Sequence, residues 1–422
     1  MATLHAQRRD PAPDAARAAA PRAFLLRTAA AYVVILVALS ALVSLVYRPQ
    51  TGVEATLDGP EFLDAWFHRD SGWYWAIAEH GYFYIPGQQS SIAFFPSYPL
   101  TVRGVGNLIG GDMQLAGTLV AVAAALAATL LFAQWARERL APRSAAVATA
   151  LMLLYPFSFF LYGPVYGDSL FILGAVAAFV LLDRGHPLLA ALVGITATAG
   201  RPVGLAVTVG LAVRAVELLA LRRRAAAAAA AGPAPDGPAD RPVTLRELVS
   251  VLPFARAREY VVLLSIAGLV SWCVYLQVEF GDALAWIHVQ AAPGWNQGSG
   301  PSTWFKVHFA GTLVNGPLEN ILLLTPQALA SGLAVLLVPR VRRLFGWGYA
   351  ALAAGVLAIA IVGTKDFMGT GRYALAAFPV MAAGGDVLAT RGARWVAPLA
   401  LGLSGAGLVV ASIFYSRGYA VS

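Results

Sequence analysis

Asp70, an acidic residue in an unusually aromatic setting, is the strongest candidate for chemistry in this chain. It follows His68 and Arg69, precedes Trp73 and Tyr74, and comes shortly after the first long apolar segment. A carboxylate near a bilayer interface costs free energy to desolvate, so its presence there indicates a function. A carboxylate can act as a general base toward an attacking hydroxyl, and this predicts chemistry on a sugar or a phosphate.

Two structural roles for these residues stay open beside the chemical one. Asp70 precedes Ser71-Gly72-Trp73, where an Asp would cap the first turn of a helix. The surrounding aromatic residues are also typical of side chains that anchor a helix at the membrane interface. They are Trp66, Trp73, Tyr74, Trp75, Tyr82, Phe83 and Tyr84.

Three basic residues at the ends of apolar segments are candidates for holding a phosphate. Arg201 stands directly before Pro202, which is favoured in the first turn of a helix, and helix N-termini attract anions. Arg372 follows Gly369-Thr370-Gly371, whose glycines allow close backbone approach, and Lys365 precedes it. For each of the three the alternative is a side chain that reaches the lipid headgroups, and for Lys365 this alternative is favoured.

The remaining polar candidates have weaker support. Asp168 opens an apolar segment, so capping that helix is favoured over a role as a second acidic group. Glu79 and His80 are adjacent and therefore do not share a helix face, which argues against a metal pair. His288 lies in a later loop and is a candidate for substrate contact. We expect no metal site and no cofactor.

The composition is that of an integral membrane protein. The chain has 422 residues, of which 59% are hydrophobic and 12% charged; its mean hydropathy is +0.67. About eleven segments are apolar enough to be membrane helices, so we expect an all-α polytopic bundle. They span 24–47, 114–133, 144–162, 169–182, 188–200, 203–220, 260–279, 317–338, 344–363, 372–389 and 395–415. The basic residues are spread over short loops, which excludes a nucleic-acid surface.

The distribution of basic residues predicts the orientation. With the N-terminus in the cytoplasm, 22 of the 30 Lys and Arg residues lie on the cytoplasmic side. Residues 1–23 are then a disordered cytoplasmic segment, and 24–422 form one transmembrane domain. Loops 48–113 and 280–316 lie outside the cytoplasm, and 221–258 is a flexible cytoplasmic linker that meets anionic lipid headgroups. Helical spacing of aromatic residues predicts an interfacial helix within Gly59–Ala78.

Three short motifs resemble the first luminal loop of PIG-V-like mannosyltransferases, membrane enzymes of the GT-C type. They are Arg69-Asp70-Ser71-Gly72-Trp73-Tyr74, Ile77-Ala78-Glu79-His80-Gly81-Tyr82 and Ala93-Phe94-Phe95-Pro96-Ser97-Tyr98-Pro99. The order and spacing are similar, and Arg69 stands where the family usually has Trp. Weaker similarities follow at Tyr166-Gly167-Asp168-Ser169, Ala199–Gly204 and Gly371-Arg372-Tyr373. The composition, rich in Ala and Arg, is typical of a bacterial member.

The resemblance implies a GT-C-like fold and an inverting transfer of a sugar, usually mannose, from a polyprenyl-phosphate donor. Asp70 would be the base, and Arg201, Arg372 and Lys365 would hold the donor phosphate. Further substrate contacts would come from Arg69, Trp73, Tyr74, Glu79, His80, Asp168, Tyr373 and His288. The acceptor would be a glycolipid or a surface glycan on the extracytoplasmic face of the plasma membrane, and the membrane lipids would be the protein's other partners.

Two other function classes fit a polytopic chain. A transporter or lipid flippase would place ionisable groups near the middle of the bilayer, on broken helices. Here the polar candidates fall at the edges of the expected external loops, which favours an interfacial enzyme. The other class is a non-catalytic scaffold of the same fold.

Overall fold

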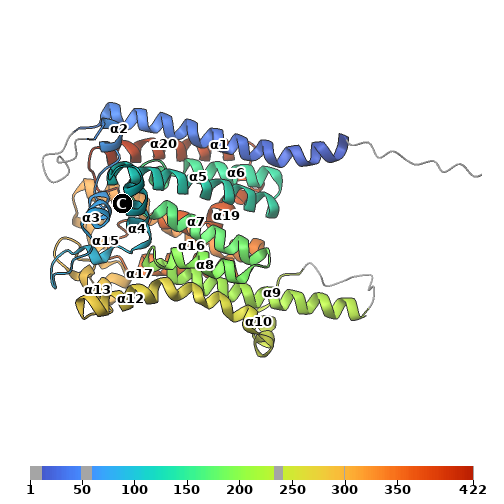
Figure 1. Ribbon diagram of the computed structural model, residues 1–422. Coiled ribbons are helices and arrows are strands. Elements are labelled where there is room, and N and C mark those ends of the chain that lie inside the picture. Colours follow the sequence, from blue (N-terminus) through green and yellow to red (C-terminus); the bar gives the residue numbers. More distant parts are fainter. Residues whose placement is uncertain (1–11, 49–58, 232–240, 299, 422) are drawn as a thin grey trace, which may run out of the picture.

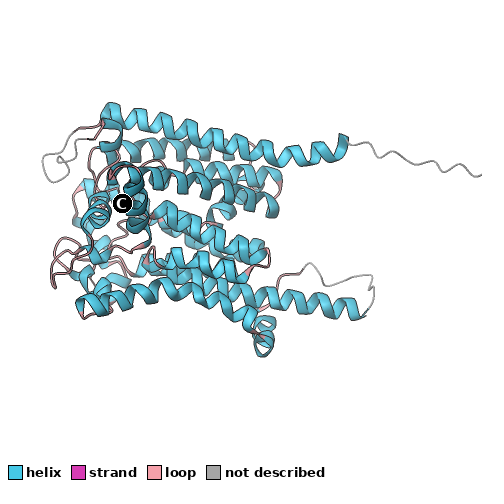
Figure 2. Ribbon diagram, in the orientation of Figure 1, coloured by secondary structure: helices cyan, strands magenta, loops and turns pink. Residues whose placement is uncertain are grey.

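A computed structural model describes residues 12–48, 59–231, 241–298 and 300–421. Within these ranges the chain forms helices and loops and no strand (Figure 2). This confirms the expected all-helical membrane fold. Six helical stretches among the described residues are long and apolar enough to cross a bilayer. They are Arg22–Val46, Met113–Arg139, Pro202–Ala230, Ala257–Phe280, Leu318–Phe345 and Val396–Ser416.

All eleven expected segments are helical, although five of them form shorter helices. Long uniform runs of apolar residues favour helix because only a helix satisfies every backbone polar group within one segment. The longer helices are α1 (Ala12–Val46), α5 (Met113–Arg139), α9 (Leu205–Ala231), α16 (Leu318–Phe345) and α20 (Val396–Ser416). The sixth long stretch, Ala257–Phe280, ends with α12 (Ala267–Phe280). The shorter ones are α6 (Pro142–Leu154), α7 (Asp168–Asp183), α8 (Pro187–Thr198), α17 (Trp347–Val362) and α19 (Pro379–Thr390).

The helices pack side by side into one bundle (Figure 1). The closest neighbours are α17 with α9, α7 with α8, α19 with α6 and α5 with α7. One buried cluster, which includes Trp135, Tyr349 and Phe378, runs through the interior. Trp135 donates a hydrogen bond to the hydroxyl of Tyr349 at 2.8 Å, so the polar atoms of both rings are satisfied inside the bundle.

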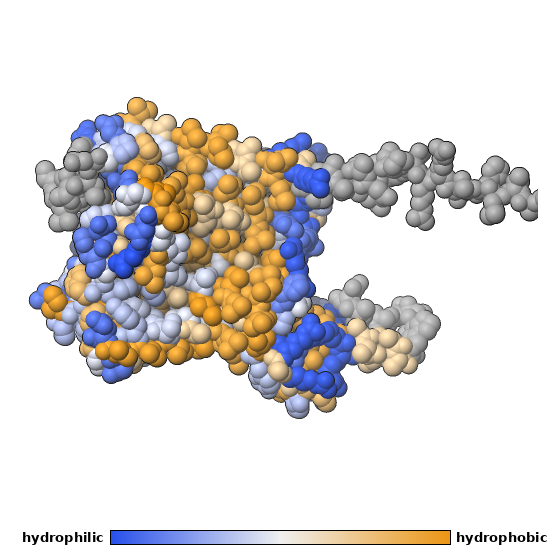
Figure 3. Space-filling view, viewed as in Figure 1, coloured by the Kyte–Doolittle hydropathy of each residue, from blue (hydrophilic) through white to orange (hydrophobic). Residues whose placement is uncertain are grey.

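A belt of apolar side chains crosses the face of the bundle shown in Figure 3, with polar side chains at its two ends. Exposed side chains along the belt include Leu329, Leu333 and Leu336 of α16 and Leu403 of α20. Large apolar side chains so widely exposed would be unfavourable in water, whereas lipid tails solvate them. The surface therefore agrees with a protein that spans a membrane.

Short helices gather at one end of the bundle, where Figure 1 places α2, α3, α4, α13 and α15 at the same end as the C-terminus of the chain. Those before α5 are α2 (Glu61–Asp64), α3 (Ser71–His80), η2 (Ser91–Ala93) and α4 (Ser97–Leu108). Those after α12 are α13 (Ala285–His288), η8 (Val289–Ala291), α14 (Pro301–Trp304) and α15 (Val307–Asn315). They belong to the two large loops expected from the sequence.

Three local expectations need correction. The single interfacial helix within Gly59–Ala78 is wrong, because the chain turns between α2 and α3 at Arg69, whose φ of 56° no helix allows. Residues 12–23 are helical, since α1 begins at Ala12, and residues 1–11 lie outside the described part. The 221–258 segment is helical to Ala231 and again in α10 (Leu245–Val251); residues 232–240 also lie outside the described part.

Candidate functional site

Asp70 lies in a tight turn at the end of the bundle where the short helices gather. It occupies the position before the first residue of α3, yet its side chain makes no capping hydrogen bond. Its own backbone is helical, with φ −65° and ψ −15°, whereas a capping residue is normally extended. The helix-cap role is therefore not realised, and the carboxylate remains available for other contacts.

Side chains from distant parts of the sequence hold this turn. The Asp70 backbone N–H donates to the hydroxyl of Tyr166 at 3.0 Å. Tyr415 of α20 donates to the carbonyl of His68 at 2.9 Å, and its hydroxyl lies 3.2 Å from Ser71 Oγ. The guanidinium of Arg69 donates to the carbonyl of Gly418 just beyond α20. These contacts fix the left-handed conformation of Arg69 and thereby the direction of the Asp70 side chain.

Asp70 belongs to a cluster of four charged side chains, which we call the charge cluster: Asp70, Asp168, Arg201 and Arg372. Arg201 forms an ion pair with Asp168, and both side chains are at least 94% buried. Arg372 lies between the two acids, with Nη1 3.8 Å from Asp168 Oδ2 and Nη2 3.9 Å from Asp70 Oδ2. Two cations and two anions thus share one site, although they come from four separate segments.

These contacts decide between the alternatives left open by the sequence. Asp168 is the first residue of α7, and its carboxylate pairs with Arg201 rather than capping the helix. Arg201 precedes the short helix η4 (Pro202–Gly204) but points into the protein, so it does not reach the headgroups. Arg372 precedes α18 (Tyr373–Ala376), and its side chain is only 12% exposed. The three residues form one buried unit.

The two arginines keep hydrogen-bond donors that no described group satisfies. Nε and Nη1 of Arg201 and Nε and Nη1 of Arg372 are all buried without a hydrogen-bond partner. Buried polar groups in proteins are nearly always hydrogen-bonded, because an unmade bond costs the desolvation free energy of the group. Four such donors on two neighbouring guanidinium groups are the arrangement expected of a site for an anion with several oxygens.

Aromatic rings enclose the arginines. The Arg372 guanidinium lies over the rings of Phe160, Tyr166 and Tyr373, at 5.2, 5.5 and 5.7 Å from their centres. Arg201 lies 5.6 Å from the centre of the Tyr373 ring. Such cation–π contacts stabilise the charges without using their N–H donors.

Asp70 differs from the rest of the charge cluster in its accessibility. Its side chain is 34% exposed, against 4% for Asp168, so Asp70 is the acid that an incoming molecule can reach. The surrounding protein desolvates this carboxyl and raises its pKa, while Arg372 and Arg201 act in the opposite direction. Burial also raises the pKa of Tyr74 beside it to about 12, so that its hydroxyl stays protonated at neutral pH.

Trp73 forms an aromatic wall beside the Asp70 turn. Its ring stacks on Phe94 with centres 5.7 Å apart, and Trp295 from the second loop lies 5.7 Å away. Trp73 and Trp295 are both half-buried, which leaves part of each ring accessible. The two large loops therefore meet through these rings close to the accessible carboxylate.

Other predicted site residues lie away from this cluster. Glu79 and His80 are exposed at the far end of α3, more than two turns from Asp70. His288 is exposed and pairs with Asp282 at 2.7 Å. Lys365 shares a loop with Arg372, but within the described part of the chain it forms no ion pair with Asp70 or Asp168. Their proposed substrate contacts stay predictions.

Sequence reasoning missed several residues that shape the site. Tyr166 and Tyr415 anchor the Asp70 turn, and Trp295 completes the aromatic wall. A lone aromatic residue at the end of an apolar segment is usually an interfacial anchor, so nothing in the sequence distinguished Tyr415 or Trp295. Only the position of Tyr166 two residues before Asp168 gave a signal. Among the described residues no group of three His, Cys, Asp or Glu side chains is placed to hold a metal ion.

Comparisons with known proteins find no family model and no curated protein that matches this chain. Among solved structures it is similar to the Archaeoglobus fulgidus oligosaccharyltransferase in its apo form, with 12% identity and a TM-score of 0.44. That match covers 93% of this chain and 56% of the other. A second match is a structure of the same archaeal enzyme, AglB, in complex with an inhibitory peptide and a dolichol-phosphate. Its identity to this chain is 12% and its TM-score is 0.43, and the match covers 92% of this chain and 56% of the other. The chain thus spans about half the length of these enzymes, and a likeness at this level assigns no function.

Proposed function

We propose that this chain is a membrane glycosyltransferase of the GT-C type that moves mannose from a polyprenyl-phosphate donor to a glycolipid or surface-glycan acceptor. The observation that carries the proposal is the pair of buried arginines with four unsatisfied donors beside an accessible carboxylate. A phosphate supplies oxygen acceptors for the donors, and a hydroxyl supplies a proton for the carboxylate. Transfer from a sugar phosphate to a hydroxyl uses both.

The donor phosphate is assigned to Arg201 and Arg372. Guanidinium groups present planar sets of donors that match phosphate oxygens, and the positive charges stabilise a phosphate that leaves with its electron pair. Asp168 binds Arg201 and lies next to Arg372, so it positions both side chains. The polyprenyl tail of such a donor would lie along the apolar belt of the bundle, while the phosphate meets the polar end.

Asp70 is assigned to the acceptor. Its carboxylate takes the proton of the acceptor hydroxyl as the oxygen forms a bond to the anomeric carbon. The bond between that carbon and the phosphate oxygen breaks at the same time, and its electrons leave with polyprenyl phosphate. Attack on the face opposite the phosphate inverts the anomeric configuration. The rings of Trp73 and Trp295 offer surfaces on which a sugar can stack.

Three parts of the proposal are supported by the sequence alone. They are the choice of mannose as the sugar, the extracytoplasmic location of the site and the cytoplasmic location of the N-terminus. The three motifs around Asp70 resemble mannosyltransferases, and the excess of arginine at the opposite end of the bundle supports the orientation. The test is to incubate the purified full-length protein with polyprenyl-phosphate-mannose and candidate acceptors, with polyprenyl-phosphate-glucose in parallel. We expect a mannosylated product. Transfer of glucose alone would contradict the sugar assignment, and transfer from neither donor to any acceptor would contradict the function.

Replacing Arg372 by Gln is expected to weaken use of the donor about tenfold or more. A hydrogen bond between charged partners contributes about 1.5–3 kcal/mol, and each 1.4 kcal/mol is a factor of ten. The KM for the donor should rise while the KM for the acceptor changes little. Arg343→Gln, at the other end of the bundle, is the matched control. An unchanged KM for the donor in Arg372→Gln would remove this residue from the phosphate site.

We expect the activity of sugar transfer to fall on the acidic side of its pH profile, with a midpoint above pH 3.8, the ordinary pKa of an Asp side chain. Asp70 must be ionised to accept a proton, and burial raises its pKa, so activity is lost as pH falls through that raised value. Arg372 lowers the pKa of Asp70, so in Arg372→Gln the midpoint should move to higher pH. The measurement is kcat/KM against pH for both proteins; a midpoint that stays in place would contradict the coupling.

A further inference from the structure

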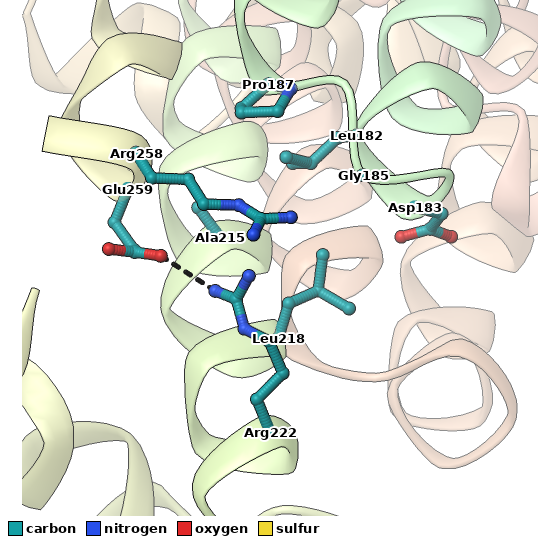
Figure 4. A pocket seen from close by; sticks show the side chains of 9 residues that line it. All are labelled: Leu182, Asp183, Gly185, Pro187, Ala215, Leu218, Arg222, Arg258 and Glu259. Carbon is teal, nitrogen blue, oxygen red and sulfur yellow. Dashed lines mark hydrogen bonds and ion pairs between the residues drawn. The ribbon is translucent and has the colours of Figure 1, made fainter. Parts of the chain in front are cut away.

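A second concentration of arginines lies at the opposite end of the bundle, around the C-terminal half of α9. Two adjoining cavities of about 210 and 400 Å³ occur here. Arg222, Arg258 and Glu259 line both of them, and Figure 4 shows the smaller one. Arg223 and Arg256 line the larger one as well. We call the two cavities together the arginine pocket.

The charge of the arginine pocket is unbalanced. Arg222 is paired with Glu259 at 2.7 Å, so both of these charges are satisfied within the protein (Figure 4). Asp183, the other acid of the lining, already binds Arg214 at 2.7 Å. Arg223, Arg256 and Arg258 form no ion pair within the described part of the chain. Three positive charges that face one space favour an anion.

The walls between these arginines are apolar. Leu219, Pro253 and Phe254 line the larger cavity, and Leu182 and Leu218 line the smaller. The Arg223 guanidinium stacks on the Phe254 ring at 3.6 Å, so this arginine is held in place without losing its donors. A small hydrated anion gains nothing from apolar walls, whereas the upper part of an acyl chain does.

The segment that carries Phe254 also presents apolar side chains outward. Leu245, Val249 and Leu252 are 60%, 58% and 47% exposed, at spacings of four and three residues that put them on one face of α10 and the turn after it. The neighbouring face, with Leu248 and Val251, packs against α9. A short helix with a second, outward apolar face next to arginines is typical of a segment lying in the membrane interface.

Salt bridges fix α10 in this position. Glu247 accepts from Thr244 in a reciprocal helix cap, and these bonds lower the pKa of Glu247 to about 2. Its carboxylate also binds Arg224 of α9 at 2.9 Å. This ion pair and the buried contacts between the two helices tie α10 to α9 and place the outward apolar face beside the arginine pocket.

We propose that the arginine pocket binds the headgroup phosphate of an anionic phospholipid, with α10 lying in the same leaflet. The positive charges match the phosphate, the apolar walls match the start of the acyl chains, and the exposed face of α10 continues into the hydrocarbon. The site lies at the far end of the bundle from Asp70 and is independent of sugar transfer (Figure 1).

The test uses the full-length protein, purified in a neutral detergent and titrated with phosphatidylglycerol, while bound lipid is counted by native mass spectrometry. The pocket variant carries Arg223→Gln, Arg256→Gln and Arg258→Gln. The control variant carries Arg143→Gln, Arg391→Gln and Arg394→Gln, which removes three exposed arginines outside the pocket. We expect at least about tenfold weaker binding in the pocket variant and little change in the control, since each arginine near an anionic surface contributes about 1 kcal/mol.

Three outcomes would overturn the proposal. An equal loss in the control variant would show that only overall charge matters. Equal binding of phosphatidylcholine, which is neutral, would show that the headgroup charge is not recognised. Displacement of the lipid by inorganic phosphate at the same concentration would show a site for a free anion. Should the pocket variant fail to fold, Arg258→Gln and Arg256→Gln are measured as single variants. Each is expected to weaken lipid binding severalfold. If both single variants bind the lipid as tightly as the wild type, the proposal is also overturned.

Discussion

Replacing Asp70 by Asn is expected to lower the rate of sugar transfer by about 10²–10⁴-fold, the usual contribution of a general base. Asn keeps the shape of the side chain but cannot accept the proton of the acceptor hydroxyl. The loss should appear in kcat, with little change in the KM of the donor, because the arginines that hold the phosphate remain. The measurement is transfer from polyprenyl-phosphate-mannose under saturating donor. Glu138→Gln, which neutralises an exposed acid at the end of α5 that is no candidate for the site, is the matched control.

The same substitution should leave folding intact. Because burial raises the pKa of Asp70 above its unfolded value, the folded protein favours the neutral form, and ionised Asp70 lowers stability at neutral pH. A neutral Asn removes this cost, so the unfolding temperature should stay equal to that of the wild type or rise. An inactive protein of undiminished stability is the expected pair of results. Full activity in Asp70→Asn would end the assignment of the base.

Replacing Asp168 by Asn is expected to destabilise the protein by about 3–5 kcal/mol, the usual cost of removing one partner from a buried ion pair. Asp168 is 4% exposed and pairs with Arg201, and it also lies beside Arg372. Without it, two buried cations face each other with only the partly exposed Asp70 nearby. Denaturant or thermal unfolding in detergent measures the change. Glu138→Gln, whose carboxylate is 43% exposed, should change stability by less than about 1 kcal/mol.

Removing both Asp168 and Arg201 separates the contribution of their ion pair to stability from the cost of leaving a buried cation without its partner. In the double variant Asp168→Leu with Arg201→Met, most of the lost stability should return, because no buried charge is left without its partner. Sugar transfer should not return, since Arg201 is assigned to the donor phosphate. If Asp168→Asn proved as stable as Glu138→Gln, Asp168 and Arg201 would not form a buried pair in the folded protein.

The helical segments were predictable because apolar composition alone determines them. Each of the eleven expected segments forms a helix, since a run of apolar residues in lipid has no other way to satisfy its backbone. The start of α1 was not predictable: residues 12–23 carry few large apolar side chains, yet they continue the helix. The turn at Arg69 was also hidden, because it depends on contacts with Tyr415 and Gly418 at the other end of the chain.

The charge cluster was predictable residue by residue but not as a unit. Asp70, Asp168, Arg201 and Arg372 were each singled out, with a cap or a headgroup contact as the alternative. Local sequence cannot separate these roles, since the pairing of Asp168 with Arg201 joins two segments 33 residues apart. The structure decides where the side chains lie, while their roles in transfer stay predictions. Glu79 and His80 were singled out from a motif in the same way, but the fold places them at the other end of α3 from Asp70, away from the charge cluster.

The bond from Arg69 to the carbonyl of Gly418, together with the contacts of Tyr415, has a consequence for biosynthesis. A membrane protein is inserted from its N-terminus onward, so the Asp70 turn enters the membrane long before its anchors are synthesised. The turn acquires its final geometry only when α20 docks. A chain synthesised only as far as α19 therefore carries this carboxylate without the contacts that hold its turn, and the turn is completed only after α20 has been made and has docked.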